Sequence, residues 1–169
     1  MGWLTRRERP PEKLAAAVGK DERIVSWADT PDGEVVAVTP SGLWWPEPDA
    51  LRCIPWPHID KVIWQDGRLF VIEADVVDDL LLVDRPPVSV ALATPRDLPP
   101  IVRKRVEANI VRTELVTVAG GAVRFVGRRQ PGRDGVIWWA RLEPGTPDSA
   151  EVRAAVRARV AILRAARPD

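Results

Sequence analysis

Residues 54–73 of the chain read IPWPHIDKVIWQDGRLFVIE, and this stretch decides the fold. At its centre, Gln65-Asp66-Gly67 has the composition of a tight hairpin turn, because glycine readily adopts the positive φ angle that such a turn needs. On both sides of the turn apolar residues recur at alternating positions, as in strands that bury one face. The stretch therefore predicts a β-hairpin of residues 59–64 and 68–73 with these inward, core-forming side chains: Ile54, Trp56, Ile59, Val62 or Ile63, Leu69 and Val71.

Short β-branched and aromatic segments flank this hairpin on both sides. Turn sequences with proline and glycine, at 31–33 and 40–42, separate the upstream segments. The pattern predicts a meander of roughly seven or eight short antiparallel strands. Besides the hairpin itself, the strands are expected at residues 24–27, 35–39, 43–45, 51–54, 76–83 and 88–93.

After residue 96 the hydrophobic period changes from two to about 3.6 residues. Asp97 as an N-cap, followed by apolar side chains at three- and four-residue spacing, predicts an amphipathic helix over residues 97–112. Asp148 and Glu151 provide a capping-box-like start for a long terminal helix. The remaining elements are a short helix at 11–18, a second β section at 115–118, 122–128 and 136–142, and the terminal helix at 148–166.

These elements predict an α+β fold that is mainly β: a strongly bent antiparallel sheet plugged by a helix, with a C-terminal β section and a long terminal helix. The changes of pattern divide the chain into three segments. Residues 1–21 form an N-terminal extension and residues 22–112 a bent-sheet domain. Residues 113–169 form a β and helix extension that is expected to pack on this domain.

Composition restricts the class of protein. With 169 residues, 46% of them apolar, the chain is long enough to bury one well-packed core. Its single cysteine, Cys53, excludes an internal disulfide and favours a reducing compartment. No apolar stretch has the length of a signal peptide core or a transmembrane helix. Arginine greatly outnumbers lysine, which is typical of GC-rich bacterial genes. We therefore expect a bacterial, cytoplasmic protein without transmembrane insertion.

The formal net charge of +1 conceals an uneven distribution of charge. Residues 1–95 carry a net charge of −6 and residues 96–169 a net charge of +7, counted from the printed sequence. Such a distribution can steer an acidic partner to the C-terminal part, or it can hold the two parts of one chain together. The internal attraction is the interpretation we favour.

Known catalytic and metal-binding patterns are missing from the sequence. His58 and Asp60 can share one face of a strand, but no strained-turn nucleophile accompanies them. One histidine and one cysteine exclude the usual zinc sites, and the sequence has no glycine-rich phosphate loop. The acidic residues of EADVVDDLLLVD, at 73–84, lack the spacing of a calcium loop and are interpreted as a solvated strand edge. We therefore expect no cofactor, no metal and no catalytic residues.

Eight tryptophans and no tyrosine make the aromatic content unusual. In a strand, neighbours point to opposite faces, so each of the pairs 44–45 and 138–139 must place one ring inward and one outward. The outward ring requires cover by a terminal helix, a second subunit or a ligand, and for 138–139 we favour the helix at 148–166. Arginines surround this second pair. The candidate interaction surface is Arg124, Arg128, Arg129, Arg133, Trp138, Trp139 and Arg141.

The segments ERIVSWADTPDGEVVAVTPSGLWWP (22–46) and LRCIPWPHIDKVIWQDGRLFVIEAD (51–75), followed by the helix at 97–112, resemble bacterial pleckstrin-homology-like domains. More specifically, they resemble a small, uncharacterised actinobacterial family of that type. The resemblance implies a strongly bent antiparallel sheet with one open corner plugged by that helix. Eukaryotic proteins of this fold often bind phosphoinositides through a basic first hairpin loop. The matching loop here carries Asp32 and Glu34, so lipid headgroup binding is disfavoured.

Three functions of different class remain open at this stage. The leading hypothesis is a non-catalytic module that binds a protein partner or itself, with a homodimer as one form, through an exposed sheet edge or the arginine and tryptophan surface. The alternative is binding of nucleic acid or another acidic surface by the basic C-terminal half, where the order helix, three strands, helix is similar to a double-stranded-RNA-binding domain. A further alternative is an enzyme whose site the sequence does not reveal.

Overall fold

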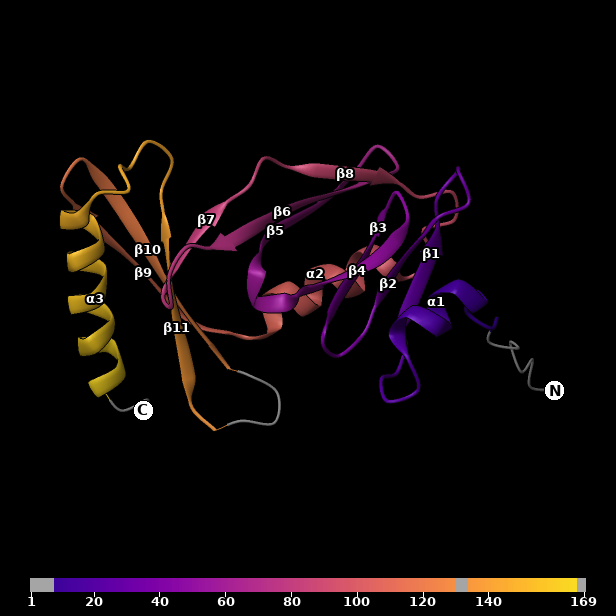
Figure 1. Cartoon of the computed structure of the whole chain (residues 1–169), viewed down its shortest axis with the longest axis horizontal. Helices are drawn as coiled ribbons and strands as arrows, with labels where there is room; N and C mark the ends of the chain where they lie inside the picture. The colour runs from indigo at the N-terminus through magenta and orange to yellow at the C-terminus, as the bar shows by residue number, and fades with distance from the viewer. Residues whose placement is uncertain (1–7, 130–133, 167–169) are drawn as a thin grey trace.

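The computed structural model describes residues 8–129 and 134–166 and consists of two lobes that share one long strand, β6 (Figure 1). The first lobe contains α1 (Glu12–Val18), β1 (Ser26–Asp29), β2 (Val35–Val38), β3 (Gly42–Glu47), β4 (Ala50–Pro55), a 3-10 turn η1 (Trp56–His58), β5 (Ile59–Gln65), most of β6 (Arg68–Val76), β8 (Val88–Ala91) and α2 (Leu98–Ala108). The second lobe contains the end of β6, β7 (Leu81–Asp84), β9 (Ile110–Val118), β10 (Gly121–Arg129), β11 (Val136–Leu142) and α3 (Ala150–Ala165).

Two antiparallel layers form the first lobe. Strands β1 to β4 make one layer in sequence order, and β5 and β8 flank β6 in the other. The strands β3 and β4 approach closely at Gly42, where a Cβ atom would lie 2.2 Å from the carbonyl oxygen of Ile54. A bidentate ion pair links the two layers, with 2.8 and 2.9 Å between the Arg52 guanidinium and the Glu73 carboxylate. Close packing at Gly42 thus joins β3 to β4, and the Arg52–Glu73 ion pair joins β4 to β6.

The β5–β6 hairpin confirms the turn predicted from the sequence. Asp66 and Gly67 both have positive φ angles, of 50° and 71°, as a two-residue type I′ turn requires. Gln65 and Arg68 pair directly across this turn. The turn therefore sets the register in which β5 pairs with β6.

The core of the first lobe lies between the two layers and is closed by α2. The side chains predicted to point inward from the opening stretch, Ile54, Trp56, Ile59, Leu69 and Val71, are all buried there, and Val62 packs at its margin. From α2, the buried side chains Leu98, Val102 and Val106 complete the cluster. The 54–73 stretch is therefore core-forming, as expected, and α2 plugs the bent sheet.

The first tryptophan pair behaves as predicted. Trp45 lies in the core of the first lobe, whereas Trp44 points to the other face of the β1–β4 layer. There α1 covers it, and the buried Leu14 of α1 packs in the same cluster. The cover for the outward ring is thus an N-terminal helix of the same chain.

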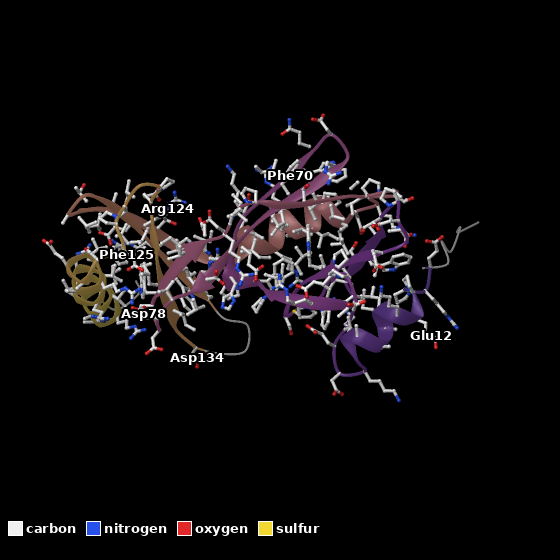
Figure 2. All side chains as sticks on the ribbon, turned by 45° about the horizontal axis from the view of Figure 1, so that its top comes forward. Glu12, Phe70, Asp78, Arg124, Phe125 and Asp134 are labelled. Atoms are coloured by element: carbon white, nitrogen blue, oxygen red, sulfur yellow. The ribbon has the colours of Figure 1, made fainter. Side chains whose placement is uncertain are left out.

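The second lobe is one sheet with a helix on one face. Strand order continues from β6 through β7, β11 and β10 to β9, and every neighbouring pair is antiparallel except β7 and β11. Phe125 of β10 points toward α3 (Figure 2) and is buried with Trp138 against Val152 and Val156. The C-terminal helix therefore covers Trp138, the inward ring of the second tryptophan pair.

Several element boundaries differ from the sequence predictions. The helix expected over 97–112 ends at Ala108, and β9 begins at Ile110 rather than at 115. Residues 76–83 are not one strand, because the Asp78 carboxylate accepts hydrogen bonds from the backbone of Leu80 and Leu81 and forms a turn before β7. The N-cap of α3 is Ser149, whose hydroxyl accepts a hydrogen bond from the Val152 backbone.

The predicted fold class is confirmed as α+β and mainly β, with a strongly curled sheet and a C-terminal helix. One connection was not foreseen. The 113–169 segment does not merely pack on the bent sheet, because β11 hydrogen-bonds in parallel with β7 and makes a single continuous sheet from β5 to β9. The strand order therefore ends in the free edges of β5 and β9, and β8, which pairs only with β6, has a further free edge within the described residues.

Candidate functional site

The predicted arginine and tryptophan surface requires a correction, because much of it is buried. Arg128 and Arg141 are each only 3% exposed, and Trp138 belongs to the core under α3. Strands β10 and β11 are covered on one face by α3 and at one end of the other face by the first lobe. Arg124 and Arg129 are accessible, and Arg133 lies outside the described residues. These residues do not form one exposed surface.

Arg128 joins the two lobes through backbone carbonyl groups. Its Nη1 donates to the Val106 oxygen of α2 at 3.1 Å, and its Nη2 donates to the Ile59 oxygen of β5 at 3.4 Å. Burial lowers the pKa of Arg128 to about 10, and the neighbouring Arg141 cation adds to this effect. The guanidinium therefore holds the last turn of α2 beside the first residue of β5.

Arg141 makes a second polar link at the same junction. Its guanidinium lies 2.5 Å from an Asp84 oxygen and 3.4 Å from an Asp60 oxygen, and its Nη2 donates to the Pro57 carbonyl at 3.4 Å. Burial raises the pKa of Asp84, although the Arg141 cation opposes this shift. Arg141 therefore ties the turn η1 and the start of β5 to the second lobe.

Trp139, the outward ring of the second tryptophan pair, packs against the first lobe. Its ring meets His58 edge-on, with 6.1 Å between the ring centroids and an interplanar angle of 85°. The indole Nε1 is buried and has no hydrogen-bond partner among the described residues. We call the set Arg128, Trp139 and Arg141 the brace. The cover for this outward ring is thus the first lobe rather than a helix.

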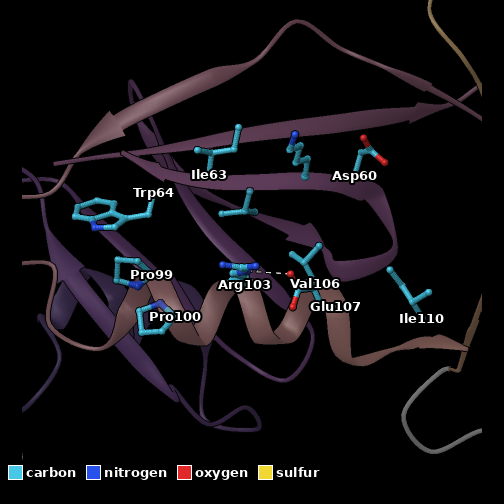
Figure 3. A pocket seen from close by; sticks show the side chains of 11 residues that line it. Asp60, Ile63, Trp64, Pro99, Pro100, Arg103, Val106, Glu107 and Ile110 are labelled. Carbon is cyan, nitrogen blue, oxygen red and sulfur yellow. Dashed lines mark hydrogen bonds and ion pairs between the residues drawn. The ribbon is translucent and has the colours of Figure 1, made fainter. Parts of the chain in front are cut away.

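A groove lies between β5 and α2 (Figure 3), and two of its lining residues contact the brace: Val106 accepts from Arg128, and Asp60 pairs with Arg141. The groove has a volume of about 600 Å³ and runs along the β5 strand. Asp60 of β5 and Val106 of α2 lie toward one end of the groove. The lining residues are Asp60, Lys61, Val62, Ile63, Trp64, Pro99, Pro100, Arg103, Val106, Glu107 and Ile110.

Some backbone N–H and C=O groups of β5 face this groove and form no hydrogen bonds with another strand in the described structure. In a two-residue hairpin, the pair that flanks the turn exchanges both backbone hydrogen bonds, and such pairs alternate along the strands. Gln65, Ile63 and Lys61 therefore turn their N–H and C=O groups toward β6. Those of Val62 and Trp64 point away from β6, to the free edge. The groove thus contains a row of available backbone donors and acceptors.

The two ends of the groove differ in chemistry (Figure 3). At one end, the Trp64 ring lies beside Pro99, and 40% of the Trp64 side chain is exposed. At the other end Asp60 already pairs with Arg141. Along α2, the Arg103 guanidinium lies 3.0 Å from the Glu107 carboxylate. These pairs match the charges of Asp60, Arg103 and Glu107, so most of the groove favours uncharged and apolar side chains, whereas Lys61 forms no ion pair within the described residues.

Sequence reasoning missed this groove, although it identified its parts. The hairpin strand and the helix that begins after Asp97 were both expected. The pattern did not show that β5 lies at a sheet edge, because strand neighbours depend on tertiary pairing. The signal that could have indicated the groove was Trp64, an aromatic residue at the end of a strand that was not among the predicted core residues.

The acidic residues of the segment 73–84 and of the loop 30–34 make local contacts. Asp75 pairs with Arg85, and Glu34 of the loop 30–34 lies 2.5 Å from Lys13 of α1. Within 8–129 and 134–166, none of the helices combines the length and apolarity needed to cross a bilayer. Comparisons of the chain with protein-family models, curated proteins and solved structures gave no match.

Proposed function

We propose that this protein is a non-catalytic interaction module that binds an extended segment of a partner protein as an added strand along β5. The observation that carries this proposal is the free hydrogen-bonding edge of β5, which opens into the groove beside α2. Strand addition is a recurring mode of peptide recognition, in which backbone hydrogen bonds give affinity and side-chain pockets give specificity.

The groove also selects the chemistry of the bound segment. In an added strand every second side chain faces α2, and these side chains meet Val62, Trp64 and Val106. Apolar residues at alternating positions satisfy this surface. Charged residues gain little there, since Asp60 and Glu107 already have arginine partners. The preferred ligand is therefore an extended segment with apolar side chains at every second position.

The brace supports binding because it forms the groove before a ligand arrives. Arg128 holds α2 and β5 together through two carbonyl groups. A preformed site loses less conformational entropy on binding than one that must be ordered. The burial of Arg128, Arg141 and Trp138 also supports this choice over nucleic-acid binding, because these side chains are unable to contact phosphates or bases.

The test is selection of peptides from a displayed library of unstructured sequences, followed by hydrogen exchange on the protein with a selected peptide. The amides of Val62 and Trp64, which point to the free edge, should exchange rapidly in the free protein and slow on binding. The amides of Lys61 and Ile63 are already paired with β6, so they provide an internal control. Protection confined to other strands would overturn the proposal.

Substitutions inside and outside the groove test whether the peptide binds there. Trp64→Ala should weaken binding of the selected peptide at least about tenfold, because tryptophan is among the residue types that most often dominate binding energy. Val88→Ala is the matched control, since Val88 of β8 is 45% exposed and lies outside the groove. Equal affinity of the two variants would contradict a site along β5.

A further inference from the structure

The opposite edge of the same sheet carries a different surface. Within the described residues β9 pairs only with β10, so one side of its nine-residue backbone is unpaired. No proline or bulge interrupts residues 112–118, and most of the strand is exposed. Long, regular edges of this kind template pairing with another chain unless a protein blocks them. The edge of β9 is therefore available for strand pairing.

The β9–β10 hairpin defines which groups of β9 point to this edge. Val118 and Gly121 pair directly across a two-residue turn, so even-numbered residues from 112 to 118 turn their backbone groups toward β10. Thr113, Leu115 and Thr117 turn theirs to the open edge. Leu115 is also the most exposed large apolar side chain described, at 64%. The edge thus combines free backbone groups with an exposed apolar residue.

We infer that β9 is a self-association surface at which two copies of the chain pair in antiparallel fashion about a two-fold axis at Thr113. In this register Arg112 lies opposite Glu114 of the second copy, and Leu115 lies beside Val111 at the bulge of β9. Opposite charges and apolar residues that face each other across antiparallel strands stabilise the pair. The axis makes each of these contacts occur twice.

Charge complementarity selects this register over its neighbours. A two-fold axis at Arg112 would place two guanidinium groups opposite each other, and an axis at Glu114 would place two carboxylates together. An axis at Leu115 would put Arg112 opposite Val118 and Glu114 opposite Val116. Only the axis at Thr113 pairs the two charges of this segment with each other.

The face of the sheet that carries α3 adds to the same surface. Arg159 of α3 pairs with Glu114, which places this flank of the helix beside β9. Ala155 and Ile162 lie four residues before and three after Arg159, so they share that flank. Ile162 is exposed, as is Leu115 on the other face of the sheet. Apolar side chains therefore border the edge on both faces. The proposal is independent of the groove along β5.

Charge exchange between two variants tests the register. Arg112→Glu and Glu114→Arg should each weaken self-association roughly tenfold or more, since each variant alone places like charges opposite each other twice. An equimolar mixture should restore most of the dimer, because both cross-strand pairs again join opposite charges and only the Glu114–Arg159 pair of one chain stays broken. Mass is measured by light scattering, and circular dichroism checks that each variant is folded. A monomeric wild type at about 100 μM, or a mixture that stays monomeric, would overturn the inference.

Disulfide trapping gives a second, independent readout in a Cys53→Ser background. In the proposed register two Thr113→Cys residues form a hydrogen-bonded pair with Cα atoms about 5.5 Å apart, within the range of a disulfide. Thr117→Cys is the matched control, because its backbone also points to the edge but lies far from the two-fold axis. Equal cross-linking of both variants would indicate random collision, and stronger cross-linking through Leu115→Cys would indicate another register. Either result would contradict the axis at Thr113.

Discussion

The two lobes bury their interiors in different ways. The first lobe closes an almost wholly apolar core between two strand layers and α2, within residues 25–106. The second lobe covers only one face of its sheet with α3, and it uses buried charged groups against the first lobe on the other face. The comparison shows that alternation of apolar residues is enough to specify the first lobe. The second lobe also needs hydrogen-bond and ion-pair partners for its buried arginines, and the first lobe supplies some of these partners.

The largest expected effect is in the core of the first lobe. Trp56→Ala should lower the free energy of unfolding by about 3–5 kcal/mol, the usual loss for truncating a buried large aromatic side chain. The Trp56 indole also donates to the carbonyls of Thr39 and Pro40, each at 3.1 Å. Chemical denaturation followed by circular dichroism measures the loss. A loss below about 1 kcal/mol would mean that the first lobe does not depend on its apolar core.

Substitutions of Trp138 and Trp139 test the two faces of the second lobe separately. Trp138→Ala should cost about 3–5 kcal/mol, because its ring is buried under α3. Trp139→Ala should cost less, about 1–3 kcal/mol, since its ring is half-buried and its Nε1 has no partner among the described residues. Denaturation midpoints of the two variants measure the difference. The reverse order would show that the junction, rather than α3, stabilises this lobe.

Arg128 tests how the lobes are joined. Arg128→Ala leaves the carbonyls of Val106 and Ile59 without their donor, so we expect a loss of about 1–3 kcal/mol. Hydrogen exchange should accelerate at the last turn of α2 and the start of β5 more than in β2 or β3. Arg129→Ala is the control, because the exposed Arg129 should change stability by less than about 0.5 kcal/mol. Uniform acceleration would indicate that Arg128 does not position the groove.

The smallest effect concerns His58. Burial lowers its pKa from the ordinary value of 6.5, Glu73 opposes this shift and Arg141 reinforces it. Because the unfolded chain binds the proton more readily, this contribution is fully present above pH 6.5 and is lost as the pH falls from there through the lower pKa of the folded protein. His58→Ala should be nearly neutral at about pH 8 and should lose less stability than the wild type on acidification. Parallel denaturation curves at both pH values check this prediction.

The same difference explains how much of the fold and the site could be predicted. The hairpin turn at Asp66 and Gly67 and the inward side chains of the opening stretch depend on local conformation and period, so the sequence shows them directly. The arginines at 128 and 141 are indistinguishable in sequence from surface arginines, because their buried partners are carbonyls and carboxylates far along the chain. The groove depends on β5 lying at a sheet edge, and the long-range strand order, including the parallel β7–β11 pairing, has no local signal in the sequence.

The continuous sheet has a consequence for the order in which the chain folds. All elements of the first lobe precede β9, and the late segment β9–β11 pairs with an earlier strand only at Leu81 with Ala140 and at Leu82 with Arg141. Contacts between distant residues form late, and N-terminal segments leave the ribosome first. We therefore expect a nascent chain to complete its apolar lobe before β11 is available. The groove would acquire its final width only when Arg128 arrives, which delays binding competence until most of the chain has been synthesised.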